Sequence, residues 1–348
     1  MELKSVQNSA TPVLSALQIF GIVTLFLYYG KSLFIPLSSA FLISFLLFPL
    51  CSWTEKKGIP RVPAIILPVI LLFVIATGLG YLLFIQIAEI SYEWAGIKTK
   101  VTEAIESASI SLAENLGVSA ERQIEILQKQ AESAGNKILS VAGSTVSSFT
   151  EAFVYVLITP IFSFLILMYR NKLVNAFYHF FPEDERSSVY RILTDTILTY
   201  YNFAKGMLVV YAAVGILNSI GLWLVGVPHP AWFGFTAAIL TFIPYVGIMI
   251  GAIIPVMVVW VTQNSAWYPI AVLFVFGIVQ ILEAYLIFPL AVGKRLKINT
   301  LVVFVMIVAG GLLWGAAGMI LFIPLIGIVK LFTDKIPNLR YVSDLLGD

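Results

Sequence analysis

Two long apolar stretches in the C-terminal third of the chain are each interrupted by residues that disfavour a straight helix. Ala231–Val261 is broken by the run Phe242–Gly247, which reads FIPYVG. Asn299–Val329 is broken by Gly310-Gly311. Proline removes a backbone donor and glycine relaxes the steric limits of the chain, so each break leaves polar backbone without its usual partners. Within lipid, such backbone is tolerated only where protein buries it or water reaches it. The fold therefore has to enclose both breaks.

The composition shows why lipid is the relevant solvent. Hydrophobic residues make up 59% of the chain and charged residues 11%, with a mean hydropathy of +0.95. Soluble domains carry about 25% charged residues. The composition predicts an all-α polytopic membrane protein, and the net charge of +2 gives no nucleic-acid surface. A single cysteine, Cys51, excludes an intrachain disulfide and a thiolate metal cluster.

Apolar segments of about 20 residues, the length that crosses a bilayer, recur along the chain. Six full spans are predicted: Val13–Tyr29, Ser32–Cys51, Val62–Ile90, Phe149–Tyr169, Gly206–Val225 and Ala266–Pro289. The loop Ser52–Arg61 is rich in lysine and arginine, so the positive-inside rule places it in the cytoplasm. We expect both termini to be cytoplasmic.

The two broken stretches leave two topologies open. If each were a full span, the chain would have eight spans, and the basic residues Lys294, Arg295 and Lys297 would face the exterior. If each is a re-entrant hairpin, with tips at Ile243–Gly247 and Gly310-Gly311, the basic cluster is cytoplasmic. The second arrangement is an inverted-topology pair, which is typical of secondary transporters.

Residues 91–150 differ from the rest because charged residues return there. Apolar residues recur every three or four positions, which predicts an amphipathic helical hairpin outside the membrane. The predicted parts of the chain are residues 1–90 with spans one to three, the hairpin 91–150, residues 151–205 with span four and a cytoplasmic segment, a core at 206–332 with both breaks, and a cytoplasmic tail at 333–348.

Glu283 is the only acidic residue between Asp195 and Asp334, and it lies within a predicted span. A charge at mid-membrane costs about 2.5–3.5 kcal/mol, so this carboxylate should face protein or a wet pathway. It either binds a cation or shuttles a proton, or it anchors broken backbone. Gln280 lies one helical turn away and can share its ligand.

Other candidates for the pathway lie at or near the breaks. At the first break, Pro244, Tyr245 and Gly247 either hold a solute through freed backbone groups or form a simple kink. Asn218 is a polar residue within a predicted span. Its side chain either takes part in transport or forms a hydrogen bond between helices. Gly310 and Gly311 mark the second break. Asn299 and Thr300 precede it, where an N-cap is the alternative to a ligand.

The sequence offers no catalytic constellation. It lacks a Ser/His/Asp set, a phosphate-binding loop and Cys/His metal spacing, so we expect no enzyme activity, cofactor or metal. Without a nucleotide-binding motif, transport would be driven by an ion gradient or would be facilitated. Secondary transport of a small polar solute or a monovalent cation is one hypothesis. A non-transporting scaffold that binds a partner through residues 91–150 is the other.

An ordered set of short motifs, spread over nearly the whole chain, resembles the AI-2E transporter family of bacterial membrane proteins. The motifs are the Gly58-Ile59-Pro60-Arg61 loop, Tyr169-Arg170, Gly226-Val227-Pro228, Ile243-Pro244-Tyr245-Val246-Gly247, Gln280-Ile281-Leu282-Glu283, Pro289 with Gly293-Lys294, and Gly310-Gly311, Gly315 and Gly318-Met319 with Pro324. The chain departs from the family pattern at Met207, where glutamine is common, and at Asn299-Thr300, where His-Pro is common.

The resemblance implies a secondary transporter that is a homo-oligomer, with a pentamer described for the family. It also implies one of two substrates: the autoinducer-2 signal, which the transporter would export, or Na⁺ (or Li⁺) in exchange for H⁺. In the second case H⁺ or Na⁺ is the coupling ion.

Overall fold

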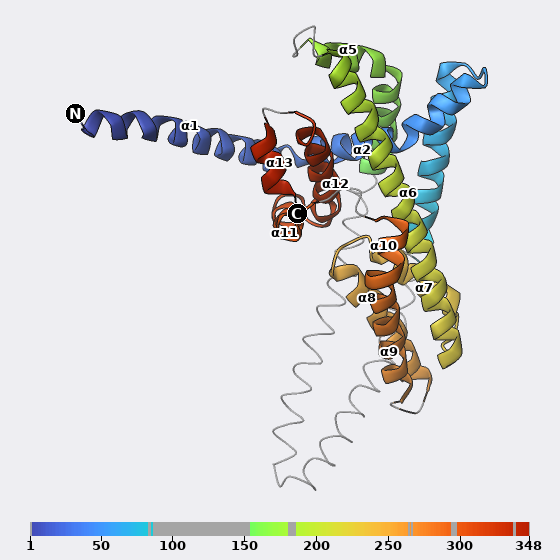
Figure 1. Ribbon diagram of the computed structural model, residues 1–348. Helices are drawn as coiled ribbons and strands as arrows, with labels where there is room; N and C mark the ends of the chain where they lie inside the picture. The colour runs from blue at the N-terminus through green and yellow to red at the C-terminus, as the bar shows by residue number, and fades with distance from the viewer. Residues whose placement is uncertain are drawn as a thin grey trace. The chain divides into compact units, whose positions relative to one another are not determined.

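The computed structural model describes residues 2–82, 85, 154–179, 186–263, 265, 267–293, 298–336 and 339–347 (Figure 1). Within these ranges the regular structure is helical, apart from one isolated antiparallel bridge between Ile298 and Gly347. The predicted hairpin at 91–150 and the basic cluster at 294–297 lie outside the described residues.

The prediction of an all-α polytopic membrane protein is confirmed. Within the described part of the chain, five helices are long and apolar enough to cross a bilayer, or six if one bent pair counts as a span. The five are Lys31–Lys56, Arg61–Leu82, Val189–Val225, Trp267–Ala291 and Ala316–Thr333. The bent pair is Val154–Met168 with Arg170–Tyr178.

The chain folds as two compact units. Unit 1 contains Met1–Val69, Tyr155–Tyr201 and Leu296–Asp348, and unit 2 contains Ile70–Val154 and Asn202–Arg295. The first broken stretch and Glu283 therefore belong to unit 2, whereas the second broken stretch belongs to unit 1.

Unit 1 begins with α1 (Glu2–Tyr29) and α2 (Lys31–Lys56), which are joined at Gly30. The helix Val154–Met168 is followed, after a bend of 64°, by α5 (Arg170–Tyr178). The C-terminal part of the unit consists of α11 (Thr300–Trp314), α12 (Ala316–Thr333) and α13 (Arg340–Leu346).

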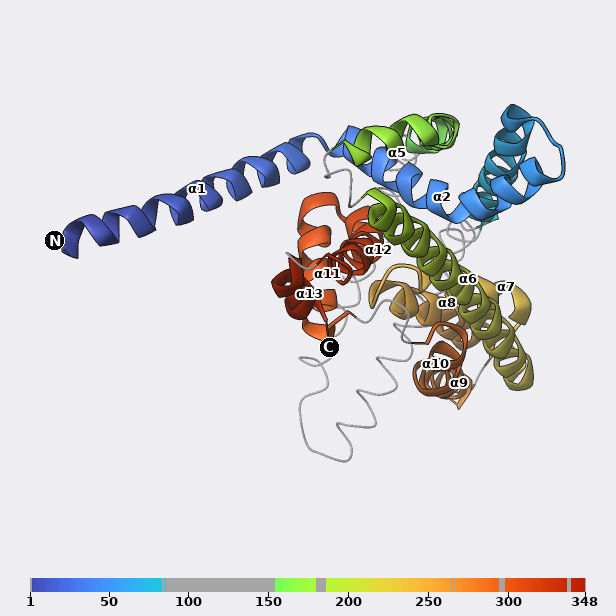
Figure 2. The same cartoon turned by 45° about the horizontal axis from the view of Figure 1, so that its top comes forward.

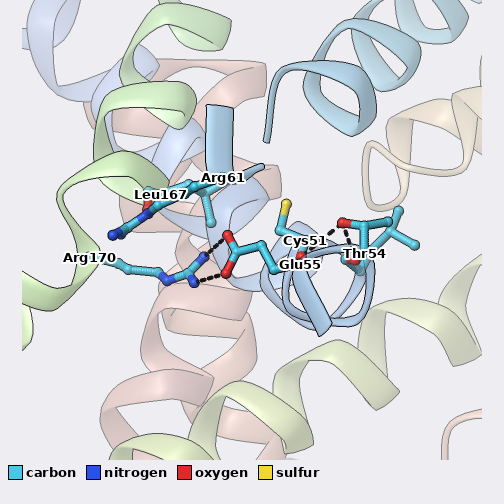
Figure 3. Close-up of polar contacts among 7 residues, drawn as sticks. Cys51, Thr54, Glu55, Arg61, Leu167 and Arg170 are labelled. Carbon is cyan, nitrogen blue, oxygen red and sulfur yellow. Dashed lines mark hydrogen bonds and ion pairs between the residues drawn. The ribbon is translucent and has the colours of Figure 1, made fainter. Parts of the chain in front are cut away.

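An ion-pair cluster fastens α2 to the bend before α5 (Figure 3). The guanidinium of Arg170 donates two hydrogen bonds to the carboxylate of Glu55, one of them at 3.1 Å. Beside it, the guanidinium of Arg61 donates to the carbonyl oxygen of Leu167 at 3.3 Å. A cation at the last carbonyls of a helix complements the negative end of its dipole. The cluster therefore ties residues 55–61 to residues 167–170, which are more than 100 positions away in sequence.

The second hairpin turns later than the sequence analysis predicted. Its arms are α11 and α12, and the turn between them is Gly315, with φ at +61°, a region that favours glycine. Gly310 and Gly311 are helical instead. A Cβ atom on Gly310 would overlap the backbone of Gly318, so glycine is needed at Gly310 for close packing of the arms and not for the turn.

Unit 2 contains the C-terminal part of α6 (Arg186–Val225), a single helix of 40 residues that starts in unit 1. The segments predicted as cytoplasmic, up to Lys205, and as a span, from Gly206, are thus parts of one continuous helix where the structure describes them. It is followed by α7 (Pro230–Leu240), α8 (Val246–Thr262), α9 (Trp267–Leu282), a π-helix η2 (Glu283–Ile287) and α10 (Phe288–Ala291).

The C-terminal part of α6 runs along one side of unit 2, with α7, α8 and α9 beside it in both views (Figures 1 and 2). Close approaches hold these helices together: a Cβ on Gly234 of α7 would overlap Ser219, and one on Gly221 would overlap Val275 of α9. Small residues at such crossings are typical of membrane helices, because they let backbones approach closely.

Candidate functional site

The first break is a tight turn between α7 and α8, which confirms the prediction of its position. The turn spans residues 241–245, and Pro244 lies within it. Tyr245 adopts φ +63° and ψ −47°, a conformation that costs a non-glycine residue free energy. At Gly247 a Cβ atom would overlap the carbonyl oxygen of Leu240, so only glycine fits there. The strain and the close contact define a specific backbone geometry at this turn.

Glu283 is half-buried in unit 2 and pairs with Gln280. The Nε2 atom of Gln280 donates to the Oε2 atom of Glu283 at 3.2 Å, which confirms that these two side chains share one face. The other amide atom, Oε1 of Gln280, is buried and has no hydrogen-bond partner in the part of the chain that the structure describes. The pair therefore still has hydrogen-bonding capacity to offer a ligand.

The π-helix η2 begins at Glu283 and has a physical cause. Pro289, early in α10, cannot donate a backbone hydrogen bond, and its ring clashes with the carbonyl four residues earlier. Widening the preceding turn relieves this clash, and the amide of Phe288 instead bonds to the carbonyl oxygen of Glu283. Such π-bulges are frequent at functional sites. Here the bulge places the lone acid of this region at a break in helical regularity.

Tyr211 of α6 packs on the turn, and the sequence analysis missed it. Its ring centroid lies 5.0 Å from that of Phe242 in the turn. The electrostatic field of Glu283 also reaches its phenol. The available signal was a tyrosine within the predicted span Gly206–Val225. Thus α6 and the α7–α8 turn of unit 2 meet at this polar aromatic side chain.

Asn218 is the polar member of a buried stripe on α6. It is fully buried, as are Val210, Val214 and Leu222 at four-residue spacing. Neither its Oδ1 nor its Nδ2 atom has a hydrogen-bond partner among the described residues, so the interhelical hydrogen bond considered from the sequence is not seen there. Burying an unpaired amide costs about 1–3 kcal/mol on mutational scales. This side chain therefore destabilises the helix core unless something else bonds to it.

Four predicted site residues lie in unit 1 and have local structural roles. The side chain of Asn299 caps α11, with its Oδ1 accepting from the amide of Leu301 at 2.9 Å, and Thr300 is the first residue of that helix. The capping alternative for Asn299 is thereby confirmed. Gly310 and Gly311 lie toward the C-terminal end of the packed arm α11. Within the described ranges, no cluster of three or more His, Cys, Asp or Glu side chains is arranged to hold a metal ion.

Comparison with known proteins assigns the family. Residues 17–338 match the model of the AI-2E family transporter. The chain belongs to the AI-2E transporter family. It is 25% identical over 316 residues to the putative transport protein YrrI of Bacillus subtilis, covering 89% of this chain and 88% of that protein. It is 27% identical over 333 residues to the putative transport protein YueF of the same organism, covering 90% and 87%.

Another AI-2E family relative carries a substrate in its name. The AI-2 transport protein TqsA of Escherichia coli is 29% identical over 145 residues, which is 40% of this chain and 42% of that protein. The resemblance noted from the sequence motifs is thus confirmed at the level of the family. Together with its apolar helices, membership makes the chain a multi-pass membrane transporter.

Proposed function

We propose that this AI-2E family protein is a secondary transporter that exports a small polar solute such as autoinducer-2. The pathway runs through unit 2 past Glu283, Gln280, Asn218 and the turn that contains Pro244, Tyr245 and Gly247. The observation that carries the proposal is the fully buried amide of Asn218, which has no hydrogen-bond partner within the described residues. A passing solute, or the water that accompanies it, supplies the missing hydrogen bonds.

The kinds of unpaired atoms favour a hydroxylated solute over a bare cation. Asn218 offers a donor and an acceptor, Gln280 an acceptor at Oε1, and Trp232 a buried donor at Nε1, each without a partner among the described residues. A bare cation coordinates oxygen and leaves N–H groups unsatisfied. A hydroxyl both donates and accepts, so a solute with several hydroxyls suits all of these atoms.

Exchange of Na⁺ or Li⁺ for H⁺ is the second candidate. Glu283 favours it, because a lone carboxylate within a spanning segment marks proton and ion pathways in membrane proteins. In this case Glu283 carries the proton or binds the cation, and H⁺ or Na⁺ is the coupling ion. A scaffold role through residues 91–150 is the candidate from another class, and that segment lies outside the described residues.

The lengths of the first arms of the two hairpins support the re-entrant topology. α7 has 11 residues and α11 has 15, which is about 16 Å and 22 Å at helical rise. The hydrocarbon core is about 30 Å thick, so neither of these first arms crosses it, whereas the second arm α12 is long and apolar enough to do so. In this topology the α7–α8 pair enters from one side and the α11–α12 pair from the other, in a bacterial inner membrane with both termini cytoplasmic. The second hairpin starts at Asn299 and Thr300, and its arms pack closely at Gly310 and Gly311. The protein assembles as a homo-oligomer, which is a pentamer by family resemblance.

Purified protein in proteoliposomes separates these candidates. Autoinducer-2 is offered in a counterflow assay, and a Na⁺ gradient is imposed in parallel with a pH-sensitive dye inside the vesicles. The export proposal predicts solute flux without Na⁺-dependent alkalinisation. Antiport predicts alkalinisation without solute flux, and the scaffold role predicts neither.

A further inference from the structure

The last described helix, α13, lies within the segment 333–348 that the sequence analysis assigned to a cytoplasmic tail, and it folds back onto the base of the second hairpin. The amide of Asn299 donates to the carbonyl oxygen of Leu346 at 2.9 Å, and Ile298 forms an antiparallel bridge with Gly347. Asn299 is the residue that begins α11. These contacts hold the end of α13 at the residue where the first apolar arm starts, and α13 lies beside α11 and α12 in both views (Figures 1 and 2).

A polar network fixes the middle of α13 to the end of the other arm. Lys330, in the last turn of α12, is only 6% exposed and forms an ion pair with Asp334. The hydroxyl of Ser343, in α13, donates to the same carboxylate. A buried lysine needs such partners, because an unpaired charge away from water is costly. α13 is therefore held at both places where the apolar hairpin meets polar sequence, which is the level of the lipid–water boundary.

The outer face of α13 is apolar and uncovered. Leu346 points into the protein and is buried, whereas Tyr341 and Leu345, one helical turn apart, are 89% and 72% exposed. Arg340 and Asp344 lie on a third, polar side of the same helix. A helix with a protein-facing, an apolar and a charged side suits a position where protein, lipid and water meet. Tyrosine and arginine are common at membrane–water interfaces.

The end of α13 lies where the exposed apolar surface of α11 begins. That surface starts at Leu301, two residues after the contact at Asn299, and continues with the same helical spacing along the arm as Phe304, Val305, Val308 and Leu312. In a membrane protein such a stripe faces acyl chains, because exposing apolar surface to water costs about 25 cal/mol per Å². The end of α13 is thus bonded to a residue that stands two positions before a lipid-facing surface.

We propose that α13 is an interfacial helix, with Tyr341 and Leu345 inserted into the membrane surface, that anchors the base of the α11–α12 hairpin at the lipid–water boundary. The partner that the apolar face of α13 binds is the surface of the lipid bilayer. A helix this short binds a membrane weakly alone, but its attachment to Asn299 and Asp334 makes insertion an intramolecular event. The proposal requires only that the chain spans a membrane, and it stands whether or not the transported solute is the one named above.

Site-specific fluorescence in lipid nanodiscs, which leave both membrane faces open to water, tests this proposal on the full chain. In a Cys51→Ala background, single cysteines replace Leu345, Tyr341 or Asp344, and each is labelled with an environment-sensitive dye. Interfacial helices bury their apolar face by about 5–10 Å, so a nitroxide placed high on the acyl chain should quench the dye at Leu345 and Tyr341. Aqueous iodide should quench the dye at Asp344 severalfold more strongly than at the other two positions.

Two results would overturn the proposal. Equal quenching by iodide at all three positions would mean that α13 stands in water. Protection of Leu345 and Tyr341 from both quenchers would mean that protein covers them, either a second copy of the chain or residues outside the described part. Circular dichroism and gel filtration of each labelled variant ensure that the comparison concerns the folded protein.

Discussion

The ring centroid of Tyr211, in α6, lies 5.0 Å from that of Phe242, in the turn between α7 and α8. The electrostatic field of Glu283, at the start of the π-helix, also reaches the Tyr211 phenol. One side chain therefore packs on the broken stretch and lies within the field of the lone acid, the two features that the sequence singled out in unit 2.

Replacing Asn218 by leucine separates a pathway role from a structural one. The two side chains are similar in size, and removing an unpaired buried amide should leave stability unchanged or raise it. If the amide bonds to solute, losing that bond costs about 1–3 kcal/mol, so solute flux in proteoliposomes should fall by roughly 5- to 150-fold. Ser219→Ala is the matched control, because the Ser219 hydroxyl already donates to Gly215 within its own helix. Full activity of Asn218→Leu would remove this residue from the pathway.

Gly247→Ala should destabilise the first hairpin. The added methyl group meets backbone atoms of Leu240, which cannot rotate away, and overpacking of this kind costs about 1–3 kcal/mol. The measurement is the thermal midpoint of the detergent-solubilised protein, followed by fluorescence-detected gel filtration. Gly277→Ala in α9 is the control, since a Cβ there meets nothing within 4 Å and alanine favours a helix. An unchanged midpoint for Gly247→Ala would show that the turn is looser than the structure indicates.

The ion pair between Glu55 and Arg170 should stabilise the bend before α5. Both side chains are largely buried, so Glu55→Gln or Arg170→Gln should each cost about 1.5–3 kcal/mol, the range for hydrogen bonds to charged groups. Thermal midpoints of both single variants and the double variant form a mutant cycle. The double variant should be destabilised by clearly less than the sum of the two. Additive effects would mean that the two groups act independently.

The re-entrant topology predicts the side of the membrane that residue 294 faces. In a Cys51→Ala background, Lys294→Cys should react with an impermeant thiol reagent in inside-out vesicles and stay unlabelled in intact cells. The reason is that a hairpin between α7 and α8 keeps the following basic cluster in the cytoplasm. Labelling from the periplasmic face alone would favour eight full spans instead.

Local features were predictable from the sequence, whereas long-range partners were not. The break at Pro244 and the cap at Asn299 follow from what proline and asparagine do to neighbouring backbone, and the structure confirms both. The partners Glu55 and Arg170 are 115 residues apart, and a single sequence gives no signal that pairs them. The contact between Tyr211 and Phe242 was missed for the same reason, because it depends on how two helices pack.

The turn of the second hairpin shows a limit of a different kind. Gly310, Gly311, Gly315 and Gly318 all lie within one short run, and glycine serves both turns and close helix packing. The structure assigns the turn to Gly315 by its positive φ and the packing role to Gly310. Composition alone could not distinguish these two roles, since both require the absence of a side chain.

The central claim is that the transport pathway runs through unit 2 past Glu283. Solute transport by the Glu283→Gln variant tests this claim most directly. Glutamine keeps the size of the side chain and can still bond to Gln280, but it cannot carry a charge. The variant is compared in proteoliposomes with Asp195→Asn, which removes an exposed carboxylate whose surface pair with Lys335 contributes about 0–1 kcal/mol. We predict that Glu283→Gln inserts and melts like the wild type but transports at the level of empty vesicles, while Asp195→Asn transports normally. Wild-type transport by Glu283→Gln would contradict the account.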